Sequence, residues 1–289
     1  MNLPKIVCPF DPGLIQSITG CALVVRVKHI SDVAEAAEQV GKSRNRLACV
    51  IVESDDPLAD MKFPEQLQNI PLAVMAVSFG RFSNLARQVN MLRGLNLRVY
   101  LPCANPENIA GLRILSSLGI HGCAMFGNGA TDWEAIADLM TYALLERTPH
   151  GSIEPFTFIA SNYDPLSYLD WGFLYFDDPE RFLHLDENGR VALSHAELLK
   201  QRFIADNILE LSEPAKCLAI SDRQEAWREY FIDNHPCASC DGWKICVGRF
   251  AARIPEDRGC SDFFREMLSV VRQYKARKIE SKEHPIWQP

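Results

Sequence analysis

Short apolar runs alternate with helix-period segments over the first 165 residues of the chain. The apolar runs are rich in β-branched residues and predict strands at residues 22–28, 47–53, 72–77, 97–102, 122–126 and 156–160. Helices are predicted between them, at residues 32–40, 64–70, 82–92, 107–118 and 132–146. This alternation predicts right-handed βαβ units and a parallel sheet, and six such strands suit a partial (β/α)6 TIM-like barrel.

The pattern changes after residue 165. Residues 171–193 are rich in aromatics and carry a turn signal, Asp186-Glu187-Asn188-Gly189, between two extended runs, which predicts a β-hairpin. A polar helical stretch, a cysteine-bearing region at 235–259 and a helix at 262–278 follow. We therefore expect an α/β protein in two parts: a partial barrel over residues 1–165 and a cysteine-rich module over residues 166–289.

Composition and charge narrow the class of protein. With 289 residues, 47% hydrophobic and 23% charged, the chain has the composition of a folded globular protein. Its 30 basic and 37 acidic residues give a net charge of −7, the wrong sign for a protein that binds phosphates, so nucleic acid is not an expected partner. The N-terminal residues do not resemble a signal peptide, and no apolar run has the length of a membrane span, so we expect a cytoplasmic protein.

The cysteines provide the strongest chemical signal. Four of them form the pattern C-x2-C-x5-C-x13-C: Cys237, Cys240, Cys246 and Cys260. Four soft ligands in a glycine-containing segment are typical of a thiolate metal site, and their spacing suits both Zn²⁺ and a [4Fe–4S] cluster. Elsewhere, Cys21, Cys49, Cys103 and Cys123 lie in or beside apolar runs and are expected in the core, whereas Cys8 and Cys217 are solitary. His235 is expected to be an ordinary loop residue, with two alternatives: that it is itself a metal ligand, or that it orients one.

Residues 183–260 resemble a SPASM domain, the C-terminal extension of radical S-adenosylmethionine (SAM) enzymes that mature ribosomal peptides and sulfatases. Three pieces carry the resemblance: the predicted hairpin, the run Asp206-Asn207-Ile208-Leu209-Glu210, and the four-cysteine pattern. Such domains hold two auxiliary [4Fe–4S] clusters, and the four cysteines match the ligands of one. Ser194 and Phe250 stand where the other cluster would have cysteines. The resemblance therefore implies one [4Fe–4S] cluster, rather than zinc, on Cys237, Cys240, Cys246 and Cys260.

The N-terminal part resembles a radical SAM barrel that lacks the catalytic residues. Residues 50–67 are similar to the family's SAM-binding strand end, but Ser54-Asp55-Asp56-Pro57-Leu58 replaces Gly-Gly-Glu-Pro-Leu. After the predicted first strand, Lys28-His29-Ile30-Ser31 leads directly into a helix, and the chain contains no C-x3-C-x2-C motif. Because three thiolates must hold the cluster that cleaves SAM, SAM is not an expected cofactor.

The resemblance implies a non-catalytic partner of a radical SAM enzyme, of a ribosomal peptide substrate, or of both. Its role would be substrate binding, electron relay or scaffolding. Trp171, Phe173, Tyr175 and Phe176 are candidates for the contact surface, although the same aromatics would also suit a core.

Two alternatives from other classes stay open. One is a barrel enzyme that uses strand-end carboxylates without SAM, with Glu53, Asp55 and Asp56 after one strand and Asn105 and Glu107 after another. The other is a zinc-stabilised interaction module, in which the four thiolates have a structural role only.

Overall fold

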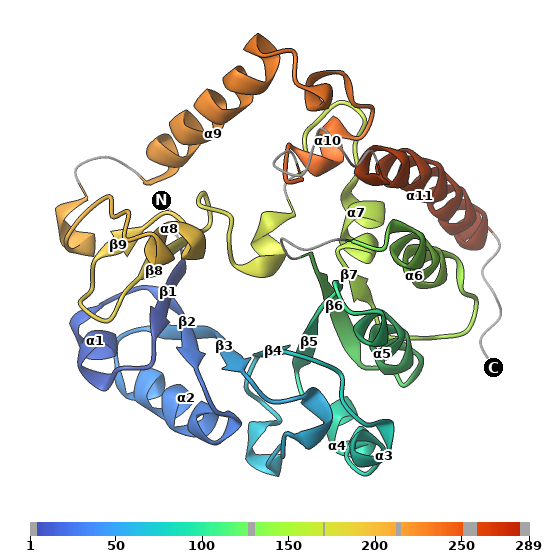
Figure 1. The fold of residues 1–289 in the computed structure, drawn as a ribbon. Coiled ribbons are helices and arrows are strands. Elements are labelled where there is room, and N and C mark those ends of the chain that lie inside the picture. Colours follow the sequence, from blue (N-terminus) through green and yellow to red (C-terminus); the bar gives the residue numbers. More distant parts are fainter. Residues whose placement is uncertain (1–4, 127–130, 170, 212–214, 251–258, 284–289) are drawn as a thin grey trace.

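The computed structural model describes residues 5–126, 131–169, 171–211, 215–250 and 259–283. The described chain is an α/β protein built on one nine-stranded sheet of order β7-β6-β5-β4-β3-β2-β1-β8-β9. Neighbouring strands from β7 to β8 are parallel, and β9 is antiparallel to β8. The strands form an open arc with α1 to α6 on its outer side (Figure 1). The sheet does not close into a complete barrel.

The strands are β1 (Lys5–Pro9), β2 (Ala22–Val27), β3 (Arg46–Ser54), β4 (Leu72–Ala76), β5 (Leu97–Pro102), β6 (His121–Met125), β7 (Ile153–Glu154), β8 (Phe182–Leu185) and β9 (Val191–Ala192). The helices around the arc are α1 (Pro12–Ser17), α2 (Val33–Lys42), α3 (Phe82–Ala86), α4 (Val89–Gly94), α5 (Pro106–Ser117), α6 (Trp133–Leu145) and α7 (Phe156–Asn162). The last part of the chain forms α8 (His195–Leu199), α9 (Ala215–Ile232), α10 (Trp243–Cys246) and α11 (Gly259–Glu283).

Five of the six predicted strands are confirmed as β2 to β6, and the prediction of a strand at 156–160 is wrong. That run is helix α7, because the Glu154 carboxylate accepts a hydrogen bond from Phe158 N at 2.8 Å and so satisfies a free amide of its first turn. The true edge strand is the short β7 just before it. The first strand is β1, which was not predicted.

Two predicted helices are also shorter than expected. Residues 64–70 contain only a 3₁₀ turn, Glu65–Leu67, and residues 82–92 divide into α3 and α4. The predicted C-terminal helix is confirmed as α11, which packs against α6 and α7.

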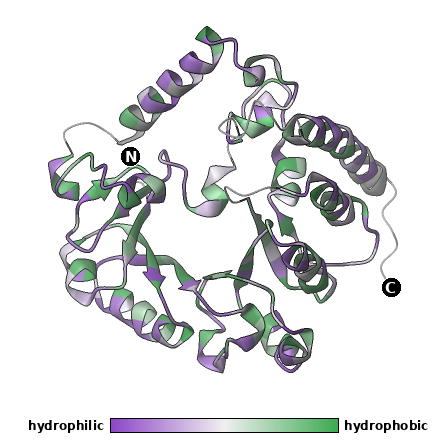
Figure 2. Cartoon of the chain, viewed as in Figure 1, coloured by the Kyte–Doolittle hydropathy of each residue, from purple (hydrophilic) through white to green (hydrophobic). Residues whose placement is uncertain are grey.

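Both faces of the sheet are apolar. The outer face packs against the helices through residues such as Val25, Val52 and Leu115, and these helices carry both hydrophobic and hydrophilic sides (Figure 2). The inner face forms a second cluster that includes Val24, Ile51 and Tyr100. None of the helices in the described part of the chain combines the length and apolar character that a membrane span requires.

The aromatic segment Trp171–Phe176, which contains a 3₁₀ turn at Gly172–Tyr175, covers this inner face (Figure 1, yellow-green). Tyr100 donates its hydroxyl hydrogen to Leu174 O at 2.8 Å, and Tyr175 donates to Ala124 O at 2.8 Å. Trp171 is fully buried and donates Nε1–H to Ile245 O at 2.7 Å. The predicted hairpin is therefore limited to β8 and β9, and the aromatics before it fill the inside of the arc.

Candidate functional site: a pocket lined by four cysteines

Short, well-defined turns position the four cysteines. Cys237 lies in a 3₁₀ turn, Pro236–Ser239, whose start is capped by His235 because its Nδ1 accepts a hydrogen bond from Cys237 N at 3.2 Å. Cys240 follows this turn directly, and Cys246 is the last residue of α10. Cys260 comes from the first turn of α11, and thirteen residues separate it from Cys246 in the pattern. His235 thus caps the turn that carries Cys237.

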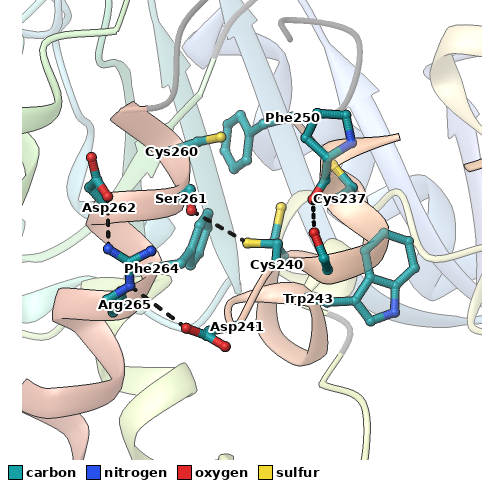
Figure 3. Close-up of a pocket in the computed structure, with 13 residues that line it drawn as sticks. Cys237, Cys240, Asp241, Trp243, Phe250, Cys260, Ser261, Asp262, Phe264 and Arg265 are labelled. Carbon is teal, nitrogen blue, oxygen red and sulfur yellow. Dashed lines mark hydrogen bonds and ion pairs between the residues drawn. The ribbon is translucent and has the colours of Figure 1, made fainter. Parts of the chain in front are cut away.

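All four cysteines line one pocket of about 440 Å³. Cys237, Cys240 and Cys260 surround the same space, with Phe250 and Phe264 beside them (Figure 3). Cys237, Cys246 and Cys260 are buried, and Cys240 is half-buried. The long spacing before Cys260 is therefore bridged by the fold, which packs the start of α11 against the cysteine-bearing turns.

The close approach between the turns and α11 depends on Gly242. A Cβ atom on Gly242 would lie 2.5 Å from Phe264 Cβ, well inside van der Waals contact. The φ angle of Gly242 is −77°, which any residue adopts, so space rather than backbone freedom requires glycine here.

The thiols influence one another electrostatically. Burial, followed by the nearness of Cys240 and Cys260, raises the pKa of the Cys237 thiol to about 11. Burial is also the main cause that raises the pKa of Cys246 to about 12, with contributions from Cys237 and Cys260. Four thiolates in this pocket would repel one another, so a bound cation or cationic cluster is needed to hold them deprotonated at neutral pH.

Polar groups at the rim complete the pocket. The Cys240 thiol donates a hydrogen bond to Ser261 Oγ, with 3.8 Å between sulfur and oxygen. The Arg265 guanidinium pairs with Asp262 at 3.0 Å and approaches Asp241 at 3.7 Å (Figure 3). A hydroxyl and a cation beside the sulfurs are groups that adjust the stability and the potential of a thiolate-bound centre.

The donor set fits a thiolate-bound centre in number and in chemistry, because four soft ligands share one pocket. The fit does not extend to a ready-made site for a single ion: among the residues that the structure describes, no group of three or more His, Cys, Asp or Glu side chains is gathered closely enough to hold one. Residues 251–258, which belong to the stretch between Cys246 and Cys260, lie outside the described residues.

The remaining cysteines lie outside this pocket. Cys103 and Cys123 are buried in the core as expected, Cys21 and Cys49 are half-buried, and Cys8 is buried in β1. Cys217 belongs to α9, and its side chain is outside the described set.

Ser194 and Phe250, which the sequence analysis singled out, have structural roles. Ser194 Oγ accepts a hydrogen bond from Glu197 N at 3.1 Å and so caps α8. Phe250 is buried and packs edge-on against Phe126 and Trp133, with ring centroids 5.4 and 5.3 Å apart.

The strand-end carboxylates have different surroundings. Glu53 is half-buried, lies 3.7 Å from Lys28 Nζ and 4.0 Å from Arg26 Nη1, and lines a second cavity. Asp55 and Asp56 are exposed, and Ser54 Oγ accepts a hydrogen bond from Asp56 N. Asn105 accepts a hydrogen bond from the amide of Glu107, so this pair begins α5.

Sequence reasoning missed this second cavity, which Arg26, His195 and the β8–β9 turn help to line. A signal was present, because Arg26 and His184 interrupt the otherwise apolar strands ALVVRV and FLHL. A polar residue within a buried strand is a better indicator of a site than one in a loop.

Comparison of the chain with protein-family models, with curated proteins and with solved structures gives no match in any of the three.

Proposed function

We propose that this chain is an iron–sulfur protein that accompanies a radical SAM peptide-modifying enzyme and does not cleave SAM itself. In this proposal Cys237, Cys240, Cys246 and Cys260 bind one [4Fe–4S] cluster. The observation that carries it is that four cysteines with cluster-ligand spacing line one pocket, although thirteen residues separate the last from the other three.

The open α/β arc supports a partial TIM-like barrel of the radical SAM type as the proposed fold, with a SPASM-like module at its C-terminal end. Seven strands follow one another in chain order along the sheet, and the helices lie outside it. The absence of C-x3-C-x2-C from the sequence supports the loss of SAM cleavage. The aromatic segment Trp171–Phe176 is consistent with that loss, because it occupies the inside of the arc.

The pocket favours a cluster over zinc. Four thiolates around one zinc ion, each about 2.3 Å from it, must lie within about 4 Å of one another. Four thiolates on a cubane cluster each bind a different iron and lie farther apart. A pocket of about 440 Å³ has room for the larger group.

A bound cluster would supply one-electron transfer. The chain's own residues would hold four thiolates, place the Ser261 hydroxyl beside Cys240, and exclude water with Trp243, Phe250 and Phe264. Reduced cysteines of this kind suit a cytoplasmic setting, which belongs to the same proposal.

A partner would find exposed aromatics close to this pocket. Phe231, which is 53% exposed, lies 5.7 Å from the Trp243 ring, and Tyr168, which is 55% exposed, lies 5.3 Å from Trp227. These two rings, rather than the packed aromatics of Trp171–Phe176, are the candidates for contact with a radical SAM enzyme or a peptide. Electron relay, substrate binding and scaffolding are the three roles that such a contact would serve.

The test begins with anaerobic reconstitution of the full chain, followed by measurement of iron, sulfide and zinc. We expect about four irons and four sulfides per chain and broad visible absorption. Cys246→Ser should lose most of the iron, whereas Cys21→Ser, a half-buried cysteine outside the pocket, should not. Binding of zinc without iron would contradict the cluster but leave the four cysteines as a metal site. Binding of neither metal would contradict the metal site itself.

Two further measurements address activity and partnership. Reduced, reconstituted protein should produce no 5′-deoxyadenosine from SAM, and production that requires the four cysteines would contradict the proposal. The chain should also be retained by a radical SAM enzyme encoded near it, under anaerobic conditions. Retention should weaken when Tyr168 and Phe231 are both changed to Asp.

A further inference from the structure

A second cavity, of about 740 Å³, lies at the carboxyl ends of β1, β2 and β3. Phe10, Arg26, Lys28 and Glu53 line it from the strand ends, and Arg190 and His195 line it from the segment that follows β8. It shares no lining residue with the cysteine pocket. The carboxyl ends of parallel strands are where ligands commonly bind in α/β folds.

Arg26 is the central charged group of this cavity. Its side chain is only 12% exposed, and its Nη1 donates a hydrogen bond to His195 Nε2 at 2.9 Å. Its nearest carboxylate is Glu53, at 4.0 Å, which also faces Lys28 at 3.7 Å. Among the described residues, no group accepts a hydrogen bond from Arg26 Nε. A buried guanidinium is always charged and normally pairs closely with an anion, so Arg26 is incompletely neutralised.

The two histidines beside Arg26 are neutral. Burial and the Arg26 charge lower the pKa of His195, which therefore accepts the guanidinium hydrogen. Its ring is stacked 6.1 Å from that of His184, whose pKa burial lowers to about 3. His184 donates Nε2–H to Phe176 O at 2.8 Å, and its buried Nδ1 has no partner within the part of the chain that is described. His195 and Leu185 O, which accepts a hydrogen bond from Arg26 Nη2 at 3.4 Å, thus hold Arg26 in place without neutralising it.

We propose that this cavity binds a monocarboxylate with an apolar body, whose carboxylate pairs with Arg26. The planar guanidinium matches a carboxylate in geometry and charge. Glu53 and Asp32 also line the cavity and would repel a dianion such as phosphate. Phe10, Leu198 and Phe203 provide apolar wall for the remainder of the ligand. This inference goes beyond the proposed cluster and does not depend on it.

Calorimetric titration of the full chain tests the proposal with matched probes: N-acetyl-leucine, N-acetyl-leucinamide and inorganic phosphate. We expect the acid to bind at least tenfold more tightly than the amide or phosphate. Arg26→Gln should weaken binding of the acid at least tenfold. Arg44→Gln, at an exposed site before the amino end of β3, should leave it unchanged.

A variant that binds N-acetyl-leucine more tightly distinguishes the proposal from simple damage to the fold, because damage only weakens binding. Glu53→Gln removes the carboxylate that competes for Arg26, so binding of N-acetyl-leucine should tighten at least threefold. Equal binding of acid and amide, tighter binding of phosphate, or unchanged affinity in both Arg26→Gln and Glu53→Gln would overturn the proposal. Should Arg26→Gln fail to fold, the comparison of acid with amide and the Glu53→Gln variant still decide it.

The carboxylate could come from a peptide C-terminus or from a small free acid. Titration with N-acetyl-Ala-Ala-Leu separates the two sources. Binding as tight as that of N-acetyl-leucine, or tighter, identifies a peptide C-terminus, and weaker binding identifies a small acid. Loss of the cysteine ligands should not change any of these affinities, which keeps this result independent of the cluster.

Discussion

Individual residues are held in charge states that depend on burial, and His184 is the clearest example. Its side chain is almost completely buried, and this burial lowers its pKa most; Arg26 and His195 lower it further, against the opposing effect of the hydrogen bond to Phe176 O. The pKa of about 3 in the folded protein lies below the usual value for an unfolded chain, about 6.5. The unfolded state therefore takes up a proton first as the pH falls.

This difference predicts a loss of stability in acid. The contribution of neutral His184 to the free energy of unfolding is fully present above about pH 6.5. It is lost as the pH falls from there towards about 3. His184→Gln, which keeps a donor for Phe176 O, should remove on the order of 2 kcal/mol of the stability change between pH 7 and pH 5. Urea unfolding at both pH values measures it.

A matched variant controls for general effects of acid. His29→Gln, at an exposed position, should leave the pH dependence of the wild-type protein unchanged. An identical pH dependence in wild-type and His184→Gln proteins would contradict the assignment.

Residue identity was sufficient to predict that four cysteines at this spacing belong together, and in the structure all four line one pocket. It was not sufficient for the cavity around Arg26. The hydrogen bond between Arg26 and His195 joins residues 169 positions apart, so only the fold brings them together. The sequence grouped Cys260 with the other three cysteines, and the placement of α11 beside the turns gives it a place in their pocket.

At the scale of elements, one buried amide ties two strand ends to a helix. Asn108, on α5, accepts a hydrogen bond from Phe79 N at 2.8 Å and donates to Pro102 O at 2.9 Å and Val77 O at 3.4 Å. It is completely buried. Its removal would leave backbone groups after β4 and β5 without partners, away from water.

Asn108→Ala should therefore destabilise the protein by about 3 kcal/mol, measured by urea unfolding. Asn162→Ala is the matched control, because that amide is exposed and donates only to Phe158 O within its own helix. The control should change the free energy of unfolding by less than about 0.5 kcal/mol. Equal effects of the two substitutions would show that the strand-end hydrogen bonds contribute little.

Replacement of glycine by alanine should change the stability of the protein in opposite directions at two positions. Gly242→Ala should cost about 1–3 kcal/mol, because the new methyl group would collide with Phe264 and separate α11 from the cysteine turns. Gly41→Ala, on the exposed side of α2 with no atom within 4 Å of the added Cβ, should stabilise by about 0.5–1 kcal/mol. Thermal unfolding of both variants checks the signs.

Gly242→Ala should also reduce the amount of bound iron after reconstitution, because Cys260 moves with α11. Full iron content in a destabilised variant would indicate that the cysteine turns and α11 do not need close contact to share a centre.

Elements with a continuous apolar run and a clear helix after them were predictable, as β2 to β6 demonstrate. The prediction failed at residues 156–160, because a short apolar run suits a buried helix as well as a strand and the deciding cap, Glu154, precedes it. It also failed at Trp171–Phe176. Those aromatics are buried by strands far away in the chain, so no local pattern distinguishes them from an exposed hairpin.

At the scale of the whole molecule, the sheet joins the two parts that the sequence separates at residue 165. β8, from the second part, pairs in parallel with β1 at the edge of the first, through Lys5, Ile6 and Val7. The α/β class and the order of the central strands follow from the sequence. The pairing of β8 with β1 does not follow from the sequence, because the chain must first cross the inside of the arc to bring β8 beside β1.

That return has a consequence for how the molecule unfolds. Trp171–Phe176 covers the apolar inner face formed by residues such as Ile51 and Tyr100, and β8 covers the edge of β1, so loss of both exposes the face to water and leaves β1 as an open edge. A chain truncated after residue 165 should therefore self-associate edge to edge, visible as oligomers in size-exclusion chromatography. The full chain should melt in one cooperative calorimetric transition, whereas a monomeric, folded fragment would show that the first part of the sheet folds without the segments that cover it.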